Sequence, residues 1–176
     1  MSDFAHRLAF DQIRDGDRLD LVADAAECAA VAARLGLVAL DRFDAHAVLA
    51  RDGRTVRATG RIKASLIQSC VATGDPVSAR VDEAFTLKFV PAPVVTAPEE
   101  ELELAGDDLD TLFYDGAAID LGEAIADSLA LAIEPYPRSP AAAEALREAG
   151  VIGEDEAGPF AALAALKGKL SGGDLV

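Results

Sequence analysis

The clearest pattern in the chain is an alternation of apolar and polar residues that begins at residue 56. The even positions from 56 to 66 are apolar apart from one glycine, and most odd positions from 77 to 89 are apolar in turn. The apolar members are Val56, Ala58, Ile62, Ala64, Leu66, Val77, Ala79, Val81, Phe85, Leu87 and Phe89. A period of two over this length is typical of strands that bury one face. The pattern therefore predicts two long strands.

The residues between these strands predict a tight turn, because Gly, Asp and Pro at positions 74–76 are all turn formers. A hairpin closed at Thr73 and Gly74 places apolar residues opposite apolar residues throughout. The expected pairs are Cys70 with Val77, Leu66 with Val81, and Ile62 with Phe85.

Weaker patterns precede the hairpin. The first twenty residues alternate loosely and predict two short strands around a turn at residues 14–18. Residues 24–36 predict a helix, since Asp24 and Glu27 have capping-box spacing and Gly36 stands where a C-terminal cap is expected. Residues 37–52 carry partial strand signals, namely Leu37, Ala39, Val48 and Ala50.

Helices are also expected after the hairpin. Asp120 and Glu123 repeat the capping-box spacing, and apolar residues follow at helical intervals until Pro135 and Pro137 end the helix. Residues 140–150 predict a short helix, and residues 159–169 predict a terminal one with an apolar stripe. That last helix, too short to be stable alone, is a candidate element for docking on its own domain or on a partner.

Two segments are strongly acidic. Residues 91–110 contain three prolines, seven acidic residues and no basic residue, which indicates a solvated loop, and residues 153–158 form an acidic spacer. We therefore expect one α+β domain over residues 1–150, built on an antiparallel sheet with a central long hairpin and flanking helices. Residues 151–176 then form a spacer and a C-terminal interaction helix.

The net charge is −15, from 31 acidic and 16 basic residues. Such a chain taken whole repels a phosphate backbone and favours basic partners, of which ribosomal proteins are an obvious class. No apolar run approaches the ~20 residues that span a bilayer. The first residues lack the features of a secretory signal, and two cysteines make no disulfide framework. These features predict a cytoplasmic protein without a membrane partner.

The charge is segregated along the chain. Residues 51–88 hold seven basic and four acidic residues, whereas residues 89–137 hold twelve acidic and no basic residue. In the predicted hairpin, five basic side chains share the outward face, which we call the basic face: Arg57, Arg61, Lys63, Arg80 and Lys88. An ordinary solvated sheet face explains this pattern, and a surface that faces RNA or phosphate explains it too. No aromatic residue interleaves these positions, so base stacking is not expected.

No set of residues indicates a catalytic, cofactor or metal site. Cys70 shares the predicted buried face with Ile62 and Leu66, which favours a packed thiol over a nucleophile. The acidic runs lack the spacing of a calcium loop, and no four Cys or His residues are spaced for zinc. We therefore expect no cofactor, no metal and no catalytic residue.

Four segments together resemble a known family: "CVATGDPV", "DEAFTLKFVP", "IDLGEAIADSLALAIEPYPR" and "PFAALAALK". In this order and spacing they resemble the bacterial YceD family of large ribosomal RNA subunit accumulation proteins, over roughly residues 55–167. The motif positions are Cys70, Pro76, Val77, Pro159, Phe160, Leu163, Leu166 and Lys167. The resemblance implies a non-enzymatic role in large-subunit rRNA accumulation or ribosome assembly, with large-subunit rRNA or its precursor as a partner.

The chain departs from the family at the hairpin. Many members carry Cys-x-x-Cys there, whereas Thr73 takes the second position in this chain. A single thiol cannot form the pair, so a metal or redox role of the pair is not expected. Physical reasoning adds that the acidic segments attract a basic ribosomal protein while the basic face approaches RNA. The alternatives are an acidic protein-interaction module that works through the C-terminal helix and, least favoured, a thiol enzyme that uses Cys70.

Overall fold

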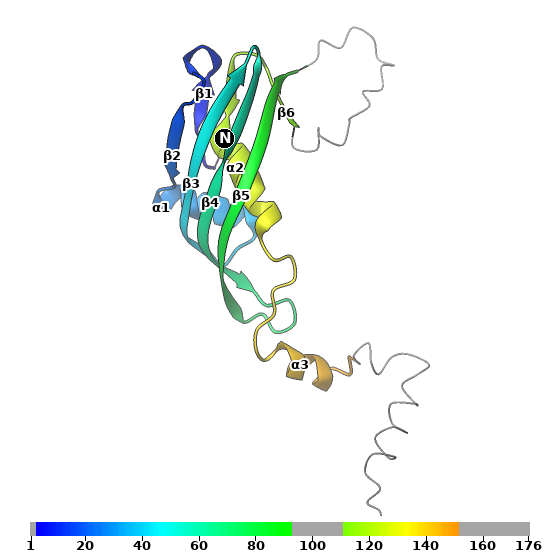
Figure 1. The fold of residues 1–176 in the computed structure, drawn as a ribbon. Coiled ribbons are helices and arrows are strands. Elements are labelled where there is room, and N and C mark those ends of the chain that lie inside the picture. The colour runs from blue at the N-terminus through cyan, green and yellow to red at the C-terminus, as the bar shows by residue number, and fades with distance from the viewer. Residues whose placement is uncertain (1–2, 93–110, 152–176) are drawn as a thin grey trace, which may run out of the picture.

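The predicted hairpin lies at the centre of a five-stranded sheet. The computed structural model describes residues 3–92 and 111–151. The sheet has the order β2-β3-β4-β5-β6, antiparallel except for the parallel pair of β5 and β6 (Figure 1). Its strands are β2 (Arg18–Val22), β3 (Ala39–Asp52), β4 (Thr55–Ser69), β5 (Pro76–Pro91) and β6 (Thr111–Tyr114). The α+β architecture expected from the sequence is confirmed.

Smaller elements complete the fold. A two-stranded sheet joins the N-terminal segment to the region before the second helix, and a 3-10 turn, η1 (Phe10–Gln12), follows the first strand. These strands are β1 (Arg7–Ala9) and β7 (Ala118–Asp120), and the helices are α1 (Ala25–Leu35), α2 (Leu121–Ala132) and α3 (Ala142–Glu148). The two strands expected in the first twenty residues both form, but they belong to different sheets because β1 pairs with β7 and β2 pairs with β3.

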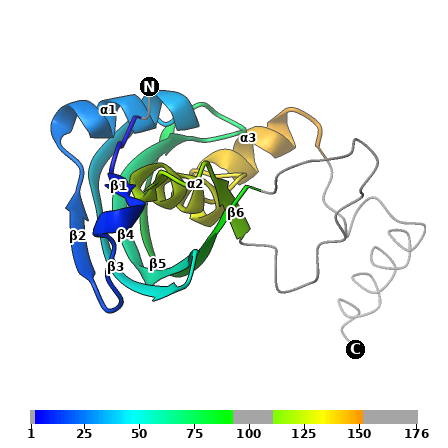
Figure 2. The same cartoon turned by 90° about the horizontal axis from the view of Figure 1, so that it is seen from above.

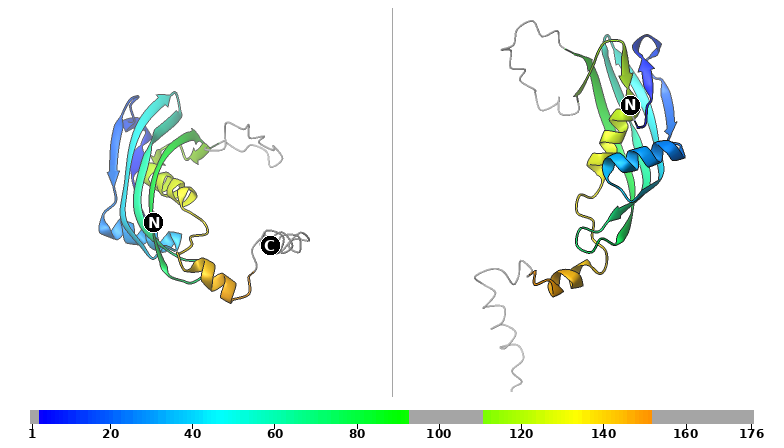
Figure 3. Two further views of the ribbon diagram at one scale, coloured as in Figure 1. Left: turned by 60° about the horizontal axis from the view of Figure 1, so that its bottom comes forward. Right: turned by 180° about the vertical axis from the view of Figure 1, so that it is seen from behind.

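The sheet is curved, and α2 lies in its concave side (Figure 2). Seen from behind, both α1 and α2 lie against the same side of the sheet (Figure 3). We call this side the covered face and the opposite side the open face. The covered face and the helices share one apolar core, whose most completely buried side chains include Phe43, Leu49, Val56, Ile62, Leu66, Leu121, Ile125 and Leu129.

Local signals in the sequence explain where α1 begins and ends. Asp24 Oδ1 accepts hydrogen bonds from the N–H groups of Ala26 and Glu27, each at 2.8 Å, and Glu27 Oε2 accepts from the Asp24 N–H at 2.9 Å. Gly36 ends the helix with φ of 66°, a conformation that glycine adopts without strain. The predicted capping box is confirmed at this helix. At α2, the structure has the Asp120 half of the box, in which the carboxylate accepts from the Glu123 N–H at 3.1 Å.

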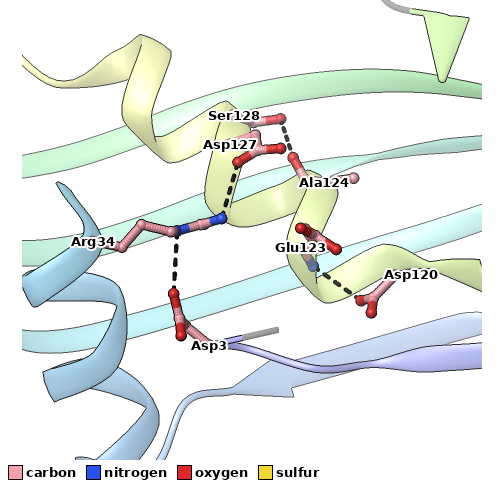
Figure 4. Close-up of polar contacts among 7 residues, drawn as sticks. All are labelled: Asp3, Arg34, Asp120, Glu123, Ala124, Asp127 and Ser128. Atoms are coloured by element: carbon pink, nitrogen blue, oxygen red, sulfur yellow. Dashed lines mark hydrogen bonds and ion pairs between the residues drawn. The ribbon is translucent and has the colours of Figure 1, made fainter. Parts of the chain in front are cut away.

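Arg34 joins the covered-face elements at the surface. Its guanidinium pairs with Asp3 at 3.5 Å and with Asp127 at 3.3 Å, so one side chain of α1 connects the N-terminal segment to α2 (Figure 4). The groups are partly exposed, so the contribution of these pairs to stability is small compared with that of the apolar core.

The predicted register of the hairpin is wrong by two residues. The structure pairs Leu66 with Ala79, Ala64 with Val81, and Gly60 with Phe85. An even shift keeps every side chain on its predicted face, which is why the alternation alone did not reveal the difference. The reason lies in the turn, which spans residues 70–75. The Cys70 N–H donates to the Asp75 carbonyl at 2.8 Å, and the Gly74 N–H donates to the Cys70 carbonyl at 2.9 Å.

Gly60 also favours the observed register. A Cβ atom at this position would lie 1.9 Å from the His46 carbonyl oxygen and 2.8 Å from the ring of Phe85. The absence of a side chain therefore leaves the space that the Phe85 ring occupies on the neighbouring strand.

Two predicted segments lie outside the described residues. They are most of the expected acidic loop, residues 93–110, and the expected C-terminal helix at residues 159–169.

Candidate nucleic-acid interface

Strand register places the basic face on the open side of the sheet. Arg57, Arg61 and Lys63 come from β4, and Arg80 and Lys88 come from β5. All except the half-buried Lys88 are exposed. The grouping predicted from alternation thus exists as a surface, but the register shows that its five members have different surroundings.

Arg57 and Lys88 form the most basic part of this surface. They lie directly opposite each other, and the same row continues to Ala50 on β3 and Thr111 on β6. Two cations placed this close together attract an anion more strongly than either does alone. We call these two residues the Arg57/Lys88 pair.

Charges alternate in sign further along the same strands. Lys63 lies between Asp44 on β3 and Asp82 on β5. Arg61 makes an ion pair with Asp82 and also donates to the Asp82 carbonyl at 3.1 Å. Asp82 is an acidic residue on the same face as the basic side chains, and its contacts with Arg61 engage that guanidinium. Arg61 is therefore less available to a phosphate than Arg57.

A third group of basic side chains includes one that sequence reasoning missed. Arg42 of β3 and Arg80 of β5 flank Ser65 of β4 in a single row, and Lys63 is in the row beside it. A depression of ≈ 380 Å³ brings Arg42, Lys63 and Arg80 together. Arg42 also pairs with Asp44. The group therefore has an excess of positive charge, although the charge of Arg42 is partly compensated.

Another depression on the open face lies over β2, β3 and β4. It measures ≈ 780 Å³, and its outward side chains carry both signs of charge: Asp20, Arg42, Asp44, His46, Arg61 and Lys63. His46 Nδ1 lies 2.7 Å from Asp20 Oδ1. The signal for the β3 members was present in the sequence, since the buried residues Phe43, Ala45, Ala47 and Leu49 alternate with the outward ones along that strand. The strand signals chosen from the sequence, such as Val48 and Ala50, belong to the opposite phase.

An exposed aromatic residue lies close to the Arg57/Lys88 pair. Phe113 of β6 is 51% exposed and pairs with Val90, two residues along β5 from Lys88. The sequence pattern predicted no aromatic residue among the basic positions. It could not place Phe113 there, because eighteen residues outside the described part of the chain, 93–110, separate β5 from β6.

Cys70 lies at the end of β4 on the covered face and is 3% exposed, as the alternation predicted. Its Sγ accepts a hydrogen bond from the Ser139 N–H at 3.2 Å. The adjacent Thr73 side chain and the Ser139 backbone N–H lower the pKa of the Cys70 thiol to about 6. Thr73 and Ser139 also donate to Asp75 Oδ2, at 2.7 and 3.2 Å. The thiol thus belongs to a hydrogen-bonded closure between the hairpin turn and the segment before α3.

The other candidate sites can now be placed. Burial raises the pKa of the Cys28 thiol inside α1, as do the nearby carboxylates. Among residues 3–92 and 111–151, no three His, Cys, Asp or Glu side chains are grouped to hold a metal ion.

Pro76 begins β5, and Val77 pairs with Gln68. The motif positions Pro159, Phe160, Leu163, Leu166 and Lys167 lie outside the described residues. No helix within the described ranges is long and apolar enough to cross a membrane.

These residues define an α+β protein whose curved sheet is covered by helices on one side and presents a charged surface on the other. The chain belongs to the YceD family: the family model, described as large ribosomal RNA subunit accumulation protein YceD, matches residues 58–167. The family name connects it with accumulation of large-subunit rRNA and so with ribosome biogenesis. No curated protein and no solved structure matches the chain.

Proposed function

We propose that the protein is a non-enzymatic, cytoplasmic factor that supports accumulation of large-subunit rRNA by contacting the rRNA or its precursor through the open face. The cluster of basic side chains on the open face carries this proposal, because Arg57 and Arg80 are exposed there and Lys88 lies directly opposite Arg57. Arg42, Lys63 and Arg80 supply further positive charge on the same face. The match to the YceD family supports the biological setting.

Charge elsewhere in the chain directs the contact to this face. The net charge of −15 repels phosphate from most of the surface, and the basic side chains of the open face attract it locally. A contact made through a few phosphates weakens steeply as salt rises, because each neutralised phosphate releases counterions. Phe113 stands near the Arg57/Lys88 pair and offers a ring on which one unpaired base would stack.

A non-enzymatic role is supported by the surroundings of Cys70. The thiol is 3% exposed, so a substrate has little access to it. Neither histidine is beside it. The His46 ring contacts Asp20 on the open face, and His6 lies next to Asp120, to which its backbone N–H donates at 3.3 Å. Cys70 therefore lacks the adjacent base that activates a catalytic thiol.

The test is the salt dependence of binding between the full chain and a fragment of large-subunit precursor rRNA. Replacing Arg57 and Lys88 by Ala should weaken binding at low salt and reduce the slope of log K against log salt by about 1.5, which is roughly 0.7–0.9 per lost phosphate contact. The matched control is the double variant Arg14→Ala, Arg147→Ala, which removes the same charge from exposed positions outside the open face. Unchanged affinity and slope in the Arg57→Ala, Lys88→Ala protein would exclude the open face as an RNA contact.

A second candidate function is an acidic module that binds a basic ribosomal protein without touching RNA. Four carboxylates favour it, since Asp115, Asp120, Glu123 and Asp127 line one groove beside α2. Purification from lysate with and without ribonuclease separates the two functions: an RNA contact is lost on digestion, and a direct protein contact survives. Deleting residues 158–176 would then show whether the C-terminal segment makes that protein contact.

A further inference from the structure

The edge of β5 is unusually long for an uncovered strand edge. β6 pairs with β5 only at residues 88–91, and β5 begins at Pro76. Within the described residues, positions 76–87 have β4 on one side and no strand on the other (Figure 1). Every second backbone N–H and C=O group of such an edge points outward and can pair with another extended chain. Twelve residues exceed the five or six of a typical strand, so the edge has room for a complete added strand.

Glu83 of this edge disfavours pairing between two copies of the chain. Glu83 lies in the same alternation as the buried Val81 and Phe85, yet it is exposed. A charge on the inward-pointing side of an edge strand is a device by which natural sheets prevent pairing between copies. A second copy would bring another Glu83 and another net charge of −15 to the edge. The composition of the edge therefore disfavours self-association and favours an added strand that carries a positive charge opposite Glu83.

An apolar groove runs beside the edge. A depression of ≈ 440 Å³ lies between β5 and the second half of α2, and its lining is mostly apolar: Ile62, Ala84, Phe85, Leu87, Leu131 and Ala132. Leu131 is 88% exposed, which is unusual for a leucine on a helix that packs against a sheet. Side chains of an added strand that point toward α2 would enter this groove and cover Leu131.

A second, acidic groove lies beside the first half of α2. A depression of ≈ 360 Å³ lies between β6 and the first half of α2, where Glu123 and Asp127 project from successive turns (Figure 4). Asp115 and Asp120 also line it. Arg7, which lies in the same lining, pairs with Asp115 at 3.5 Å, and Arg34 of α1 pairs with Asp127 at 3.3 Å. The backbone N–H groups of Ala117 and Ala118 bind the Asp115 carboxylate and lower its pKa, so it stays charged. This lining attracts cationic side chains.

We propose that the β5 edge and the adjoining α2 grooves bind an extended, basic protein segment, which adds to the sheet as a strand beside residues 76–87. Backbone hydrogen bonds to the edge supply affinity, as in other strand-addition complexes. A Lys or Arg of the segment pairs with Glu83, an aliphatic side chain fills the groove at Phe85 and Leu131, and a further cation approaches Glu123. This site gives the second candidate function a surface and a mode of binding, and it does not depend on RNA contact by the open face.

The probe is a fluorescent peptide, Lys-Thr-Val-Thr-Val-Thr-Lys, whose symmetric pattern presents Lys and Val on one face in either strand direction. We expect saturable binding to the full chain by fluorescence anisotropy and slower hydrogen exchange at the outward-pointing amides of residues 76–87. The control peptide carries N-methyl groups on alternate amides, which keeps its side chains but blocks strand pairing. It should bind at least about ten-fold more weakly, a difference of about 1.4 kcal/mol.

Two variants test the side-chain contacts. Glu83→Lys should weaken binding of the probe by about ten-fold, and Glu148→Lys, which changes the charge equally on exposed α3, should not. Leu131→Ser should also weaken binding, whereas Val22→Ser, at another exposed apolar position on β2, should not. Both positions of each pair are exposed, so loss of folding does not confound the result.

Four outcomes would overturn the proposal. They are absence of saturable binding, equal binding of the N-methylated peptide, slow exchange of the outward-pointing amides of residues 76–87 without peptide, and a dimer at working concentration. Slow exchange in the free protein would show that the chain covers its own edge, and a dimer would assign the edge to a second copy. The RNA measurements on the Arg57→Ala, Lys88→Ala protein stand apart from these, so failure here leaves the proposed RNA contact intact.

Discussion

The two faces of the sheet are made by the same strands but have opposite compositions. On β4, Ile62 and Leu66 point to the covered face and are buried, whereas Arg61 and Lys63 are on the open face next to them in the chain. The covered face depends on complementary shape, because its buried side chains form one apolar core with those of α1 and α2. The open face is charged, and its side chains interact mainly through ion pairs within a strand and between neighbouring strands. The difference teaches that mutations on one face should change folding and mutations on the other should change binding.

The largest effect is expected in the centre of the covered face. Ile125 of α2 is fully buried, and Ile125→Ala should lower the free energy of unfolding by roughly 2–5 kcal/mol, from lost apolar burial and the cavity that remains. Leu131→Ala on the same helix is the control, because its side chain is 88% exposed and the change should stay within about 0.5 kcal/mol. Urea unfolding measures both. Equal losses of unfolding free energy at the two positions would contradict the placing of Ile125 in the packed core and of Leu131 on the exposed side of α2.

The next effect concerns the close approach of strands at Gly60. Gly60→Ala should destabilise the protein by roughly 1–3 kcal/mol, because the added methyl group overlaps the His46 carbonyl and the Phe85 ring and forces the strands to shift. Thr59→Ala changes the neighbouring residue on the open face and should have a much smaller effect. A neutral Gly60→Ala substitution, measured by thermal unfolding, would mean that β3 and β5 do not approach β4 as closely as described.

A smaller effect is expected from pH at the end of β4. The Cys70 thiol has a pKa of about 6 in the folded protein, against an ordinary value of 9.0. Between these pH values the unfolded chain binds more protons than the folded one, so the stability contributed by this thiolate rises with pH. It is present in full above pH 9 and is lost as the pH falls to about 6. Stability measured from pH 6 to 9 should therefore have a steeper rise in the native protein than in Cys70→Ser, and identical pH profiles would refute an ionised thiol.

The smallest effect on stability is expected at the exposed pair of Arg61 and Asp82 on the open face. Asp82→Asn should leave stability within about 0.5 kcal/mol, because its pair with Arg61 is exposed. The same substitution releases Arg61 and removes a negative charge beside Lys63, so RNA binding at low salt should strengthen a few-fold. Asp52→Asn, which removes equal charge at the exposed end of β3, serves as the control. If both variants strengthen binding equally, the effect comes from net charge and not from Arg61.

Much of the site was predictable because alternation reports which side of a strand a residue faces. The five basic positions, the burial of Cys70 and the capping of α1 all follow from local patterns of a few residues. The position of Asp82 relative to Arg61 was not predictable, since a register shift of two residues leaves the alternation unchanged. Arg42 was missed because the strand signals chosen for β3 had the wrong phase. That strand also has an irregularity between Leu40 and Arg42.

The sequence by itself determined the composition of the two faces, the ends of α1 and the membership of the YceD family, because each depends on the order of residues within one segment. The tertiary structure alone decided which residues from different segments meet. It paired Arg57 with Lys88, brought Phe113 near them through the parallel β6, set Ser139 against Cys70, and left residues 76–87 without a partner strand among the described residues. The physical reason is that strand partners are selected by the packing of the whole core, in which the six-residue turn and the space above Gly60 count as much as local propensity.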